Sequence, residues 1–396
     1  MKKYFILILL FIPISIFGLD YPTYHSQIIE VYDLDDNKVL YEKEANKKVS
    51  IASLTKIATT ITAIENINNL DEKVTITYAI LKTVSKEASV AGLKAGDVLT
   101  YRDLLYASML PSGADATHAL AILSSGDIDS FVLKMNELST KIGLQNTHFV
   151  NVTGLDEKDH FSSADDVRKL LEYSLNNPLF REIYTSREYT MSNGKIVKST
   201  IYKYGNNIDT STIMGSKTGF TYDAGYCLST LTEVNGHEMI TILLNAPKIG
   251  NTYYNVNDTV DLILFLKEHY DNQVLIHKKD FIKSIPVKYG KIDSYDIHID
   301  KDLSKYLVND YDTSLFKYKY DGLDELSFLN YKGDKIGTLK YYYDDELLYE
   351  QSIVLKRDIK IDISKILKDY YLYIITFILI VFLLVFIIRK RKKAKR

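Results

Sequence analysis

The order in which strand-like and helix-like periodicities follow one another constrains the fold of this chain most. Residues 27–32 and 38–42 alternate between apolar and polar side chains, as the two strands of a half-buried hairpin do. The strand period returns after Tyr189, where Asn235-Gly236 predicts a tight turn before a strand over Met239–Leu244. Helical spacing fills the middle. The sequence therefore predicts an α+β fold in which one antiparallel sheet, made from both ends of the first 270 residues and flanked by helices, carries an inserted helical lobe.

Helix-boundary signals define the inserted lobe. Thr100 followed by Asp103 has the pattern of a capping box, and Pro111 stops the helix that begins there. The stretch Ser112-Gly-Ala114 is therefore expected in a loop between two helices, the second of which begins near Asp115. Further helices are expected over residues Phe131–Ile142, Ala164–Leu175 and Thr259–His269.

The two ends of the chain resemble targeting segments. Residues 1–18 combine a basic start with a short apolar run, so we expect a signal peptide. Residues 370–388 are uncharged, almost wholly apolar and long enough to span a bilayer as a helix. The basic tail 389–396 follows at once, and basic residues stay on the cytoplasmic side. The expected location is the cell membrane, with a single span and the large domain on the extracytoplasmic side.

Between these ends we expect a catalytic domain over residues 19–270 and a small β-domain over residues 271–360. The second stretch consists of strand-like runs separated by Gly, Asp and Asn turns, without a cluster of catalytic residue types. A net charge of −2 gives no reason to expect a nucleic-acid partner. Cys227 is the single cysteine, which excludes an internal disulfide.

The first candidate catalytic residues lie in the stretch Ile51–Ala58, where Ser53 and Lys56 are three residues apart. In a helix this spacing places both side chains on one face, about one turn apart. A serine hydroxyl is a weak nucleophile until a neighbouring base takes its proton. A lysine can be that base only if desolvation or a nearby cation lowers its pKa. The pair is therefore a candidate for nucleophilic catalysis.

Two further motifs follow the Ser53–Lys56 pair in the chain. Ser112-Gly-Ala114 lies in the expected interhelical loop, and Lys217-Thr-Gly219 leads into an expected strand. Three such motifs in this order make up the signature of the penicillin-recognising serine enzymes. The chain resembles that family, and most of all the D-alanyl-D-alanine carboxypeptidases among the low-molecular-weight penicillin-binding proteins. The resemblance extends to the stretches 104–116, 151–155, 163–166, 217–226 and 335–339.

The resemblance implies a role for each motif. Ser53 would attack the carbonyl between the two D-alanines of a peptidoglycan stem peptide, and Lys56 would take its proton. Ser112 would relay a proton to the leaving amine and to Lys56. The backbone N–H groups of Ser53 and Phe220 would hold the oxyanion. Water would then release the acyl-enzyme.

Substrate binding falls to the third motif in the same resemblance. Lys217 and Thr218 would hold the terminal carboxylate of the stem peptide, and Lys217 would also keep Lys56 partly neutral. Gly219 would let the strand backbone approach the substrate closely. β-Lactams would acylate the same serine. No cofactor is implied, and we expect no metal site, because His148 and His160 lack partners at metal-ligand spacing. We expect His160 at the surface.

One position departs from the family pattern, and two alternative functions stay open. The second motif usually ends in asparagine, whereas this chain has Ala114. A decayed, non-enzymatic peptidoglycan-binding or sensor protein is therefore one alternative. A β-lactamase is the other, but Glu157 lacks the asparagine expected four residues later, where Phe161 stands.

Overall fold

The computed structural model describes residues 21–205 and 208–394, which form two compact units divided between Tyr270 and Asp271. The predicted signal peptide, residues 1–18, lies outside the described residues. Each unit has its own hydrophobic core.

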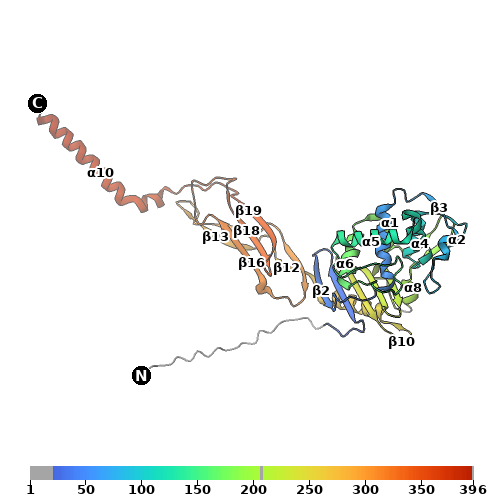
Figure 1. Cartoon of the computed structure of the whole chain (residues 1–396). Coiled ribbons are helices and arrows are strands. Elements are labelled where there is room, and N and C mark those ends of the chain that lie inside the picture. Colours follow the sequence, from blue (N-terminus) through green and yellow to red (C-terminus); the bar gives the residue numbers. More distant parts are fainter. Residues whose placement is uncertain (1–20, 206–207, 395–396) are drawn as a thin grey trace, which may run out of the picture. The chain divides into compact units, whose positions relative to one another are not determined.

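A five-stranded antiparallel sheet forms the centre of the first unit, in the order β2-β1-β9-β8-β7 (Figure 1). The predicted hairpin is present as β1 (Ile28–Asp33) and β2 (Lys38–Lys43). It pairs with strands from the other end of the unit through β1 and β9. Those strands are β7 (Ile213–Thr221), β8 (Gly225–Val234) and β9 (His237–Ala246). The prediction that both ends of the domain build one sheet is confirmed.

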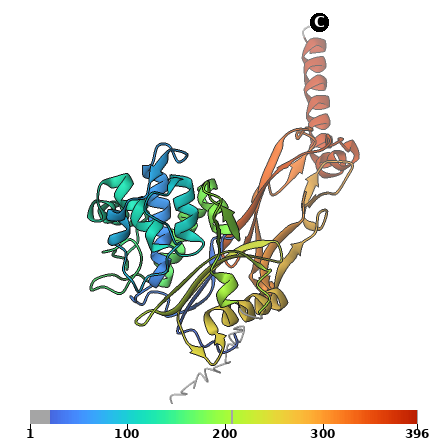
Figure 2. The same cartoon turned by 90° about the vertical axis from the view of Figure 1, so that its right-hand side faces the viewer.

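Turn chemistry fixes the central hairpin of that sheet. Asn235 and Gly236 both have positive φ, 50° and 87°, as a two-residue hairpin turn with the right twist requires. On β9, Ile240, Ile242 and Leu244 alternate into the core shared with the helical lobe. Intervening residues of β9 are buried as well, because α9 (Tyr254–His269) packs on β8 and β9. Helices therefore cover both faces of the sheet (Figure 2).

Helices fill the middle of the first unit, as predicted. The capping box at Thr100 is present, with the Thr100 side chain accepting from the Asp103 N–H and the Asp103 carboxylate accepting from the Thr100 N–H. Gly143 ends its helix in the left-handed conformation. The helices of the lobe and its surroundings are α1 (Thr55–Asn66), α2 (Tyr78–Lys82), α3 (Tyr101–Met109), α4 (Ala114–Ser125), α5 (Ile128–Ile142), α6 (Ala164–Leu175), α7 (Pro178–Thr185) and α8 (Ile201–Tyr204).

Short elements were not predicted. At the start of helix α7 the Asn177 side chain accepts hydrogen bonds from the N–H groups of Leu179 and Phe180. The helix has only 8 residues, too few to show a helical period in the sequence. Two small antiparallel pairs of strands also join the lobe. They pair β3 (Lys73–Thr75) with β4 (Val98–Thr100), and β5 (Glu188–Thr190) with β6 (Ile196–Lys198).

The second unit is built from short strands around a compact apolar core. Its sheets have the orders β12-β15, β14-β13-β17 and β16-β18-β19. Ile285, Leu339 and Tyr341 lie at the centre of the core and are fully buried. The strands are β12 (Tyr270–Ile276), β13 (Phe281–Lys288), β14 (Ser294–His298), β15 (Leu303–Val308), β16 (Phe316–Gly322), β17 (Leu326–Ser327), β18 (Lys335–Tyr343) and β19 (Glu346–Val354).

A long helix, α10 (Ile363–Ala394), ends the described chain. Its stretch Ile363–Arg391 is long and apolar enough to cross a membrane, and none of the most apolar window is buried against protein. Helix α10 begins seven residues before the predicted apolar span over 370–388, because Ile363 and Leu367 extend the helical pattern backwards.

Candidate active site

Ser53 and Lys56 lie together at the start of the first long helix. Ser53 belongs to a short 3-10 helix, η1 (Ala52–Leu54), which leads directly into α1, so the two residues share one continuous helical segment. The Lys56 Nζ lies 2.9 Å from the Ser53 Oγ, to which it donates. Ala52 has a positive φ of 47°, which marks the sharp entry into this segment. The hydroxyl and its candidate base are thus in direct contact.

A loop from elsewhere in the chain holds Lys56 from the other side. The Lys56 Nζ donates to the Thr153 carbonyl at 2.7 Å. The Asn151 Oδ1 shapes this loop by accepting from the N–H groups of Thr153 and Gly154 at 3.1 and 2.7 Å. Gly154 has a φ of 84°, and a Cβ built on it would lie 1.8 Å from the Ala52 carbonyl oxygen. The loop therefore packs against η1 more closely than any residue but glycine permits.

The environment of Lys56 suits it to act as a base. Lys56 is 2% exposed, and burial lowers its pKa to about 7, while the charge of Asp115 partly opposes the shift. We predicted that burial and the charge of Lys217 together would keep Lys56 partly neutral, and burial is the leading cause of the shift. The like-charge effect acts on the partner instead: burial first, and then Lys56, hold the pKa of Lys217 well below its usual range.

Lys217 and Ser112 form a second lysine–serine pair. Lys217 lies on β7 and is 1% exposed, and its Nζ donates to the Ser112 Oγ at 3.0 Å and to the Thr218 carbonyl at 2.7 Å. Ser112 lies between α3 and α4 with a positive φ of 61°. The Thr218 hydroxyl is hydrogen-bonded to that of Thr200, 2.5 Å away. The second and third motifs, 105 residues apart, are therefore in direct contact.

Strand β7 passes directly beside η1, which joins the third motif to the first. A Cβ on Gly219 would lie 3.0 Å from the Ser53 backbone nitrogen and 3.0 Å from the Ala52 Cβ. A larger residue would therefore crowd the approach of the two backbones, in addition to any approach of substrate. Phe220 follows on the same strand and is 40% exposed. All seven predicted site residues thus belong to three segments that touch one another.

Ala114 is the first residue of α4 and is completely buried. Its N–H donates to the Ser89 carbonyl at 2.8 Å. The next residue, Asp115, accepts from the consecutive N–H groups of Ala91, Gly92 and Leu93 at 2.7, 2.8 and 2.8 Å. The start of α4 therefore holds the loop 89–93 in place, a role of Asp115 that was not predicted.

The prediction that His160 lies at the surface is wrong. His160 is 4% exposed, and burial lowers its pKa to about 4. Its Nδ1 accepts from the Val150 N–H, so its Nε2 carries the proton and donates to the Thr55 Oγ1 at 2.9 Å. A neutral His160 therefore joins the loop that holds Lys56 to the first turn of α1.

Comparison with known proteins agrees with this geometry. Residues 18–248, more than half of the chain, match the family described as D-alanyl-D-alanine carboxypeptidase. The chain belongs to this family. Residues 270–361 match the family described as penicillin-binding protein 5, C-terminal domain. Two family domains in this order are those of a low-molecular-weight penicillin-binding protein.

Individual members of the family are similar over most of their length. The chain is 29% identical to D-alanyl-D-alanine carboxypeptidase DacF of Bacillus subtilis over 337 residues, 82% of this chain and 84% of that one. It is 34% identical to a D-alanyl-D-alanine carboxypeptidase of a Streptomyces species over 224 residues, 53% of this chain and 77% of that one. The crystal structure of penicillin binding protein 5 from Haemophilus influenzae shares the fold, with a TM-score of 0.61 at 23% identity, over 87% of this chain and 100% of that one.

Sequence reasoning missed the residues that support the site. Asn151 and Gly154 lie in a stretch that resembles the family, and an asparagine three residues before a glycine is a turn signal. That signal predicts a turn but not its contact with Lys56. Asp115 lies in the stretch 104–116 that resembles the family, and Thr200 lies outside the quoted stretches. The partners of both residues are distant in the chain, so the sequence does not indicate these contacts.

Proposed function

We propose that this protein is a serine D-Ala-D-Ala carboxypeptidase, which removes the terminal D-alanine from peptidoglycan stem peptides and is acylated by β-lactams. Membership of the D-alanyl-D-alanine carboxypeptidase family supports this function. The observation that carries the mechanism is the 2.9 Å contact between Ser53 and a fully buried Lys56 whose pKa is lowered to about 7. Near neutral pH a large fraction of such a lysine is uncharged and able to accept a proton.

In the proposed acylation step the Ser53 Oγ attacks the carbonyl carbon between the two D-alanines while its proton passes to the Lys56 Nζ. The N–H groups of Ser53 and Phe220 stabilise the resulting oxyanion. Collapse of this intermediate breaks the peptide bond, and the leaving amine takes a proton relayed through Ser112. Water then attacks the ester, with Lys56 again accepting a proton, and releases the shortened peptide.

We assign recognition of the substrate's terminal carboxylate to Lys217 and Thr218. In the free protein, burial disfavours the charged form of Lys217. A bound carboxylate would reverse this preference, because an opposite charge within a few ångströms favours the ammonium form. Binding the carboxylate would thus place a positive charge at Lys217 only when substrate is present, and it would tend to keep nearby Lys56 neutral.

We also propose that α10 anchors the enzyme in the cell membrane with both folded units on the extracytoplasmic side. The exposed apolar length of α10 and the basic tail after it support this topology. A signal peptide at residues 1–18 would deliver the chain across the membrane.

Labelling with a fluorescent penicillin, together with D-alanine release from a stem-peptide mimic, tests the proposal. Wild type is expected to label stably and to release D-alanine. Ser53→Ala should lose both, with turnover reduced by about 10⁴-fold or more, because no other group forms the acyl-enzyme. Ser50→Ala is the matched control, because Ser50 lies three residues earlier and bonds Asp156.

Other outcomes would favour the alternatives. Rapid loss of the label from wild type would indicate a β-lactamase, and absence of both labelling and turnover would indicate a decayed site. Labelling of Ser53→Ala at another serine would overturn the assignment of the nucleophile. The family comparisons do not favour either alternative.

A further inference from the structure

A groove of about 540 Å³ in the second unit is lined by five cationic side chains, here called the basic groove: Lys291, Lys332, Lys356, Arg357 and Lys360. All five residues are exposed. None has a carboxylate at ion-pair distance in the part of the chain that the structure describes. Asp358 is the one acid in the lining, and its Oδ1 already accepts from the Lys332 N–H at 2.8 Å. The groove therefore carries an excess of positive charge.

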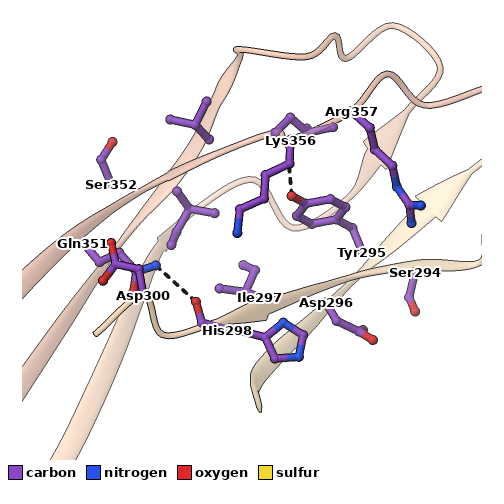
Figure 3. Close-up of a pocket in the computed structure, with 13 residues that line it drawn as sticks. Ser294, Tyr295, Asp296, Ile297, His298, Asp300, Gln351, Ser352, Lys356 and Arg357 are labelled. Carbon is purple, nitrogen blue, oxygen red and sulfur yellow. Dashed lines mark hydrogen bonds between the residues drawn. The ribbon is translucent and has the colours of Figure 1, made fainter. Parts of the chain in front are cut away.

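Backbone contacts hold the cations of the groove in place. The Lys291 N–H donates to the Lys360 carbonyl at 2.8 Å, and Gly290 and Ile361 form a β-bridge beside them. The Lys356 N–H donates to the Tyr295 hydroxyl at 3.2 Å. Figure 3 shows this contact in a neighbouring groove of about 610 Å³, into which the Lys356 side chain extends. The cations thus lie in turns, bends and loops whose backbone is tied to neighbouring segments by hydrogen bonds.

The same end of the unit holds the first turn of α10. The Lys365 Nζ donates to the Gly290 carbonyl at 2.7 Å and to the Asp293 Oδ1 at 2.8 Å. The Asp362 N–H donates to the Tyr289 carbonyl at 2.7 Å. From Ile363 to the tyrosines that begin at Tyr370 the helix rises only about 10 Å, at about 1.5 Å per residue. Interfacial tyrosines mark the level of lipid headgroups, so the groove lies about one Debye length from them.

We propose that the basic groove binds the phosphate headgroups of anionic lipids at the surface of the membrane that α10 enters. Clustered cations beside a membrane helix are attracted to anionic headgroups. The Arg357 guanidinium also suits the geometry of phosphate oxygens. A lipid is the favoured occupant because α10 brings the groove to the bilayer whether or not a soluble ligand is present. The proposal rests on the membrane anchoring by α10 proposed above, and it is independent of the chemistry at Ser53.

The test uses the full chain in nanodiscs of phosphatidylcholine, with and without phosphatidylglycerol. Native mass spectrometry of the protein after transfer to mild detergent counts the lipids that stay bound. The groove variant carries Lys291→Gln, Lys332→Gln, Lys356→Gln, Arg357→Gln and Lys360→Gln. The control variant also removes five positive charges from this unit: Lys278→Gln, Lys279→Gln, Lys301→Gln, Lys317→Gln and Lys319→Gln. Lys279 and Lys301 lie near the start of β13, at the opposite end of that strand from Gly290.

Wild type and the control variant are expected to retain phosphatidylglycerol over phosphatidylcholine, and the groove variant to lose this preference by about tenfold or more. Phosphatidylglycerol should also slow hydrogen exchange in residues 289–293 and 356–361 of wild type and the control variant, but not of the groove variant. Hydrogen exchange of the groove variant in phosphatidylcholine alone, compared with that of wild type, shows whether the variant is folded.

Three results would overturn the proposal. Equal lipid retention by the folded groove variant would place the lipid elsewhere. An equal loss of phosphatidylglycerol retention in the control variant would show that the effect depends on the total charge of the unit and not on the groove. Binding of poly(glycerol phosphate) to wild type, without retention of phosphatidylglycerol over phosphatidylcholine, would identify a site for soluble phosphates instead.

Discussion

In the unit of residues 21–270, Lys56 and Lys217 are 2% and 1% exposed, whereas the five cations of the basic groove in the second unit are all exposed. Burial lowers the pKa of both catalytic-unit lysines, and each is held by a serine hydroxyl and a backbone carbonyl. The groove lysines meet water on an open surface. The same side chain is therefore desolvated in one unit and solvated in the other.

The difference shows what a buried amine requires. Desolvation disfavours the charged form of the amine. Uncharged acceptors can take the hydrogen bonds of the amine, whereas a carboxylate in direct contact would favour the charged form again. At Lys56 those acceptors are the Ser53 hydroxyl and the Thr153 carbonyl. Removing the buried lysine should thus abolish chemistry, while removing exposed ones should not.

Lys56→Met tests this contrast with the largest expected effect. Loss of the base should slow acylation by a fluorescent penicillin by about 10³-fold, within the usual range for general-base catalysis. The groove variant defined above should acylate at the wild-type rate. Stopped-flow fluorescence measures both. Comparable slowing in the groove variant would mean that the two sets of lysines are not functionally separate.

Gly154→Ala tests the loop that supplies the carbonyl to Lys56. A Cβ there meets the Ala52 carbonyl at 1.8 Å and also requires a positive φ, so we expect a loss of about 3 kcal/mol or more in the free energy of unfolding. Gly143→Ala is the matched control, since its φ of 86° is close to the 84° of Gly154 but no atom lies within 4 Å of the added Cβ. Its expected loss is about 1–2 kcal/mol.

Chemical denaturation and acylation rate together measure the two glycine variants. The folded fraction of Gly154→Ala should acylate slowly, because the clash displaces η1 or the Thr153 carbonyl. Equal destabilisation of the two variants would show that backbone conformation, and not the close packing at Ala52, decides the need for glycine at position 154.

The pH dependence of acylation should follow Lys56. With a pKa of about 7, the neutral fraction and hence the rate should rise about tenfold between about pH 6 and about pH 8. The folded-state pKa lies below the unfolded value of 10.5, so the unfolded chain binds more protons between them, and stability should rise with pH across that window. Lys56→Met should lose this contribution. A flat rate profile in wild type would point to another base.

Ala114→Asn has the smallest expected effect. Its added amide enters a fully buried position beside Ser112 and should leave the fold intact, with turnover unchanged or raised by no more than about tenfold, the value of one polar contact. Ser112→Ala should be far more damaging, since it removes the hydroxyl that Lys217 contacts. D-alanine release measures all three proteins. A folded Ala114→Asn without activity would show that this loop is built differently from the family pattern.

Local signals along the chain determined the elements, because each depends on neighbours in sequence. The capping box at Thr100, the hairpin turn at Asn235-Gly236 and the helix end at Ile142 all formed as predicted. The order of periodicities predicted a sheet built from both ends of the first unit, and the three motifs indicated the family. Helix α7 and the two small strand pairs were not predicted, because their periodic stretches are too short.

Only the tertiary structure decided which groups surround the lysines. The Thr153 carbonyl, the buried His160 and the Asp115 carboxylate reach their partners across 97, 105 and 24 residues of sequence. A pKa depends on how completely folding removes water from a side chain and on which charges it brings close, and neither is encoded in spacing along the chain. The sequence by itself determined that Ser53 and Lys56 are neighbours, while long-range packing decided that Lys56 is buried and the groove lysines are not.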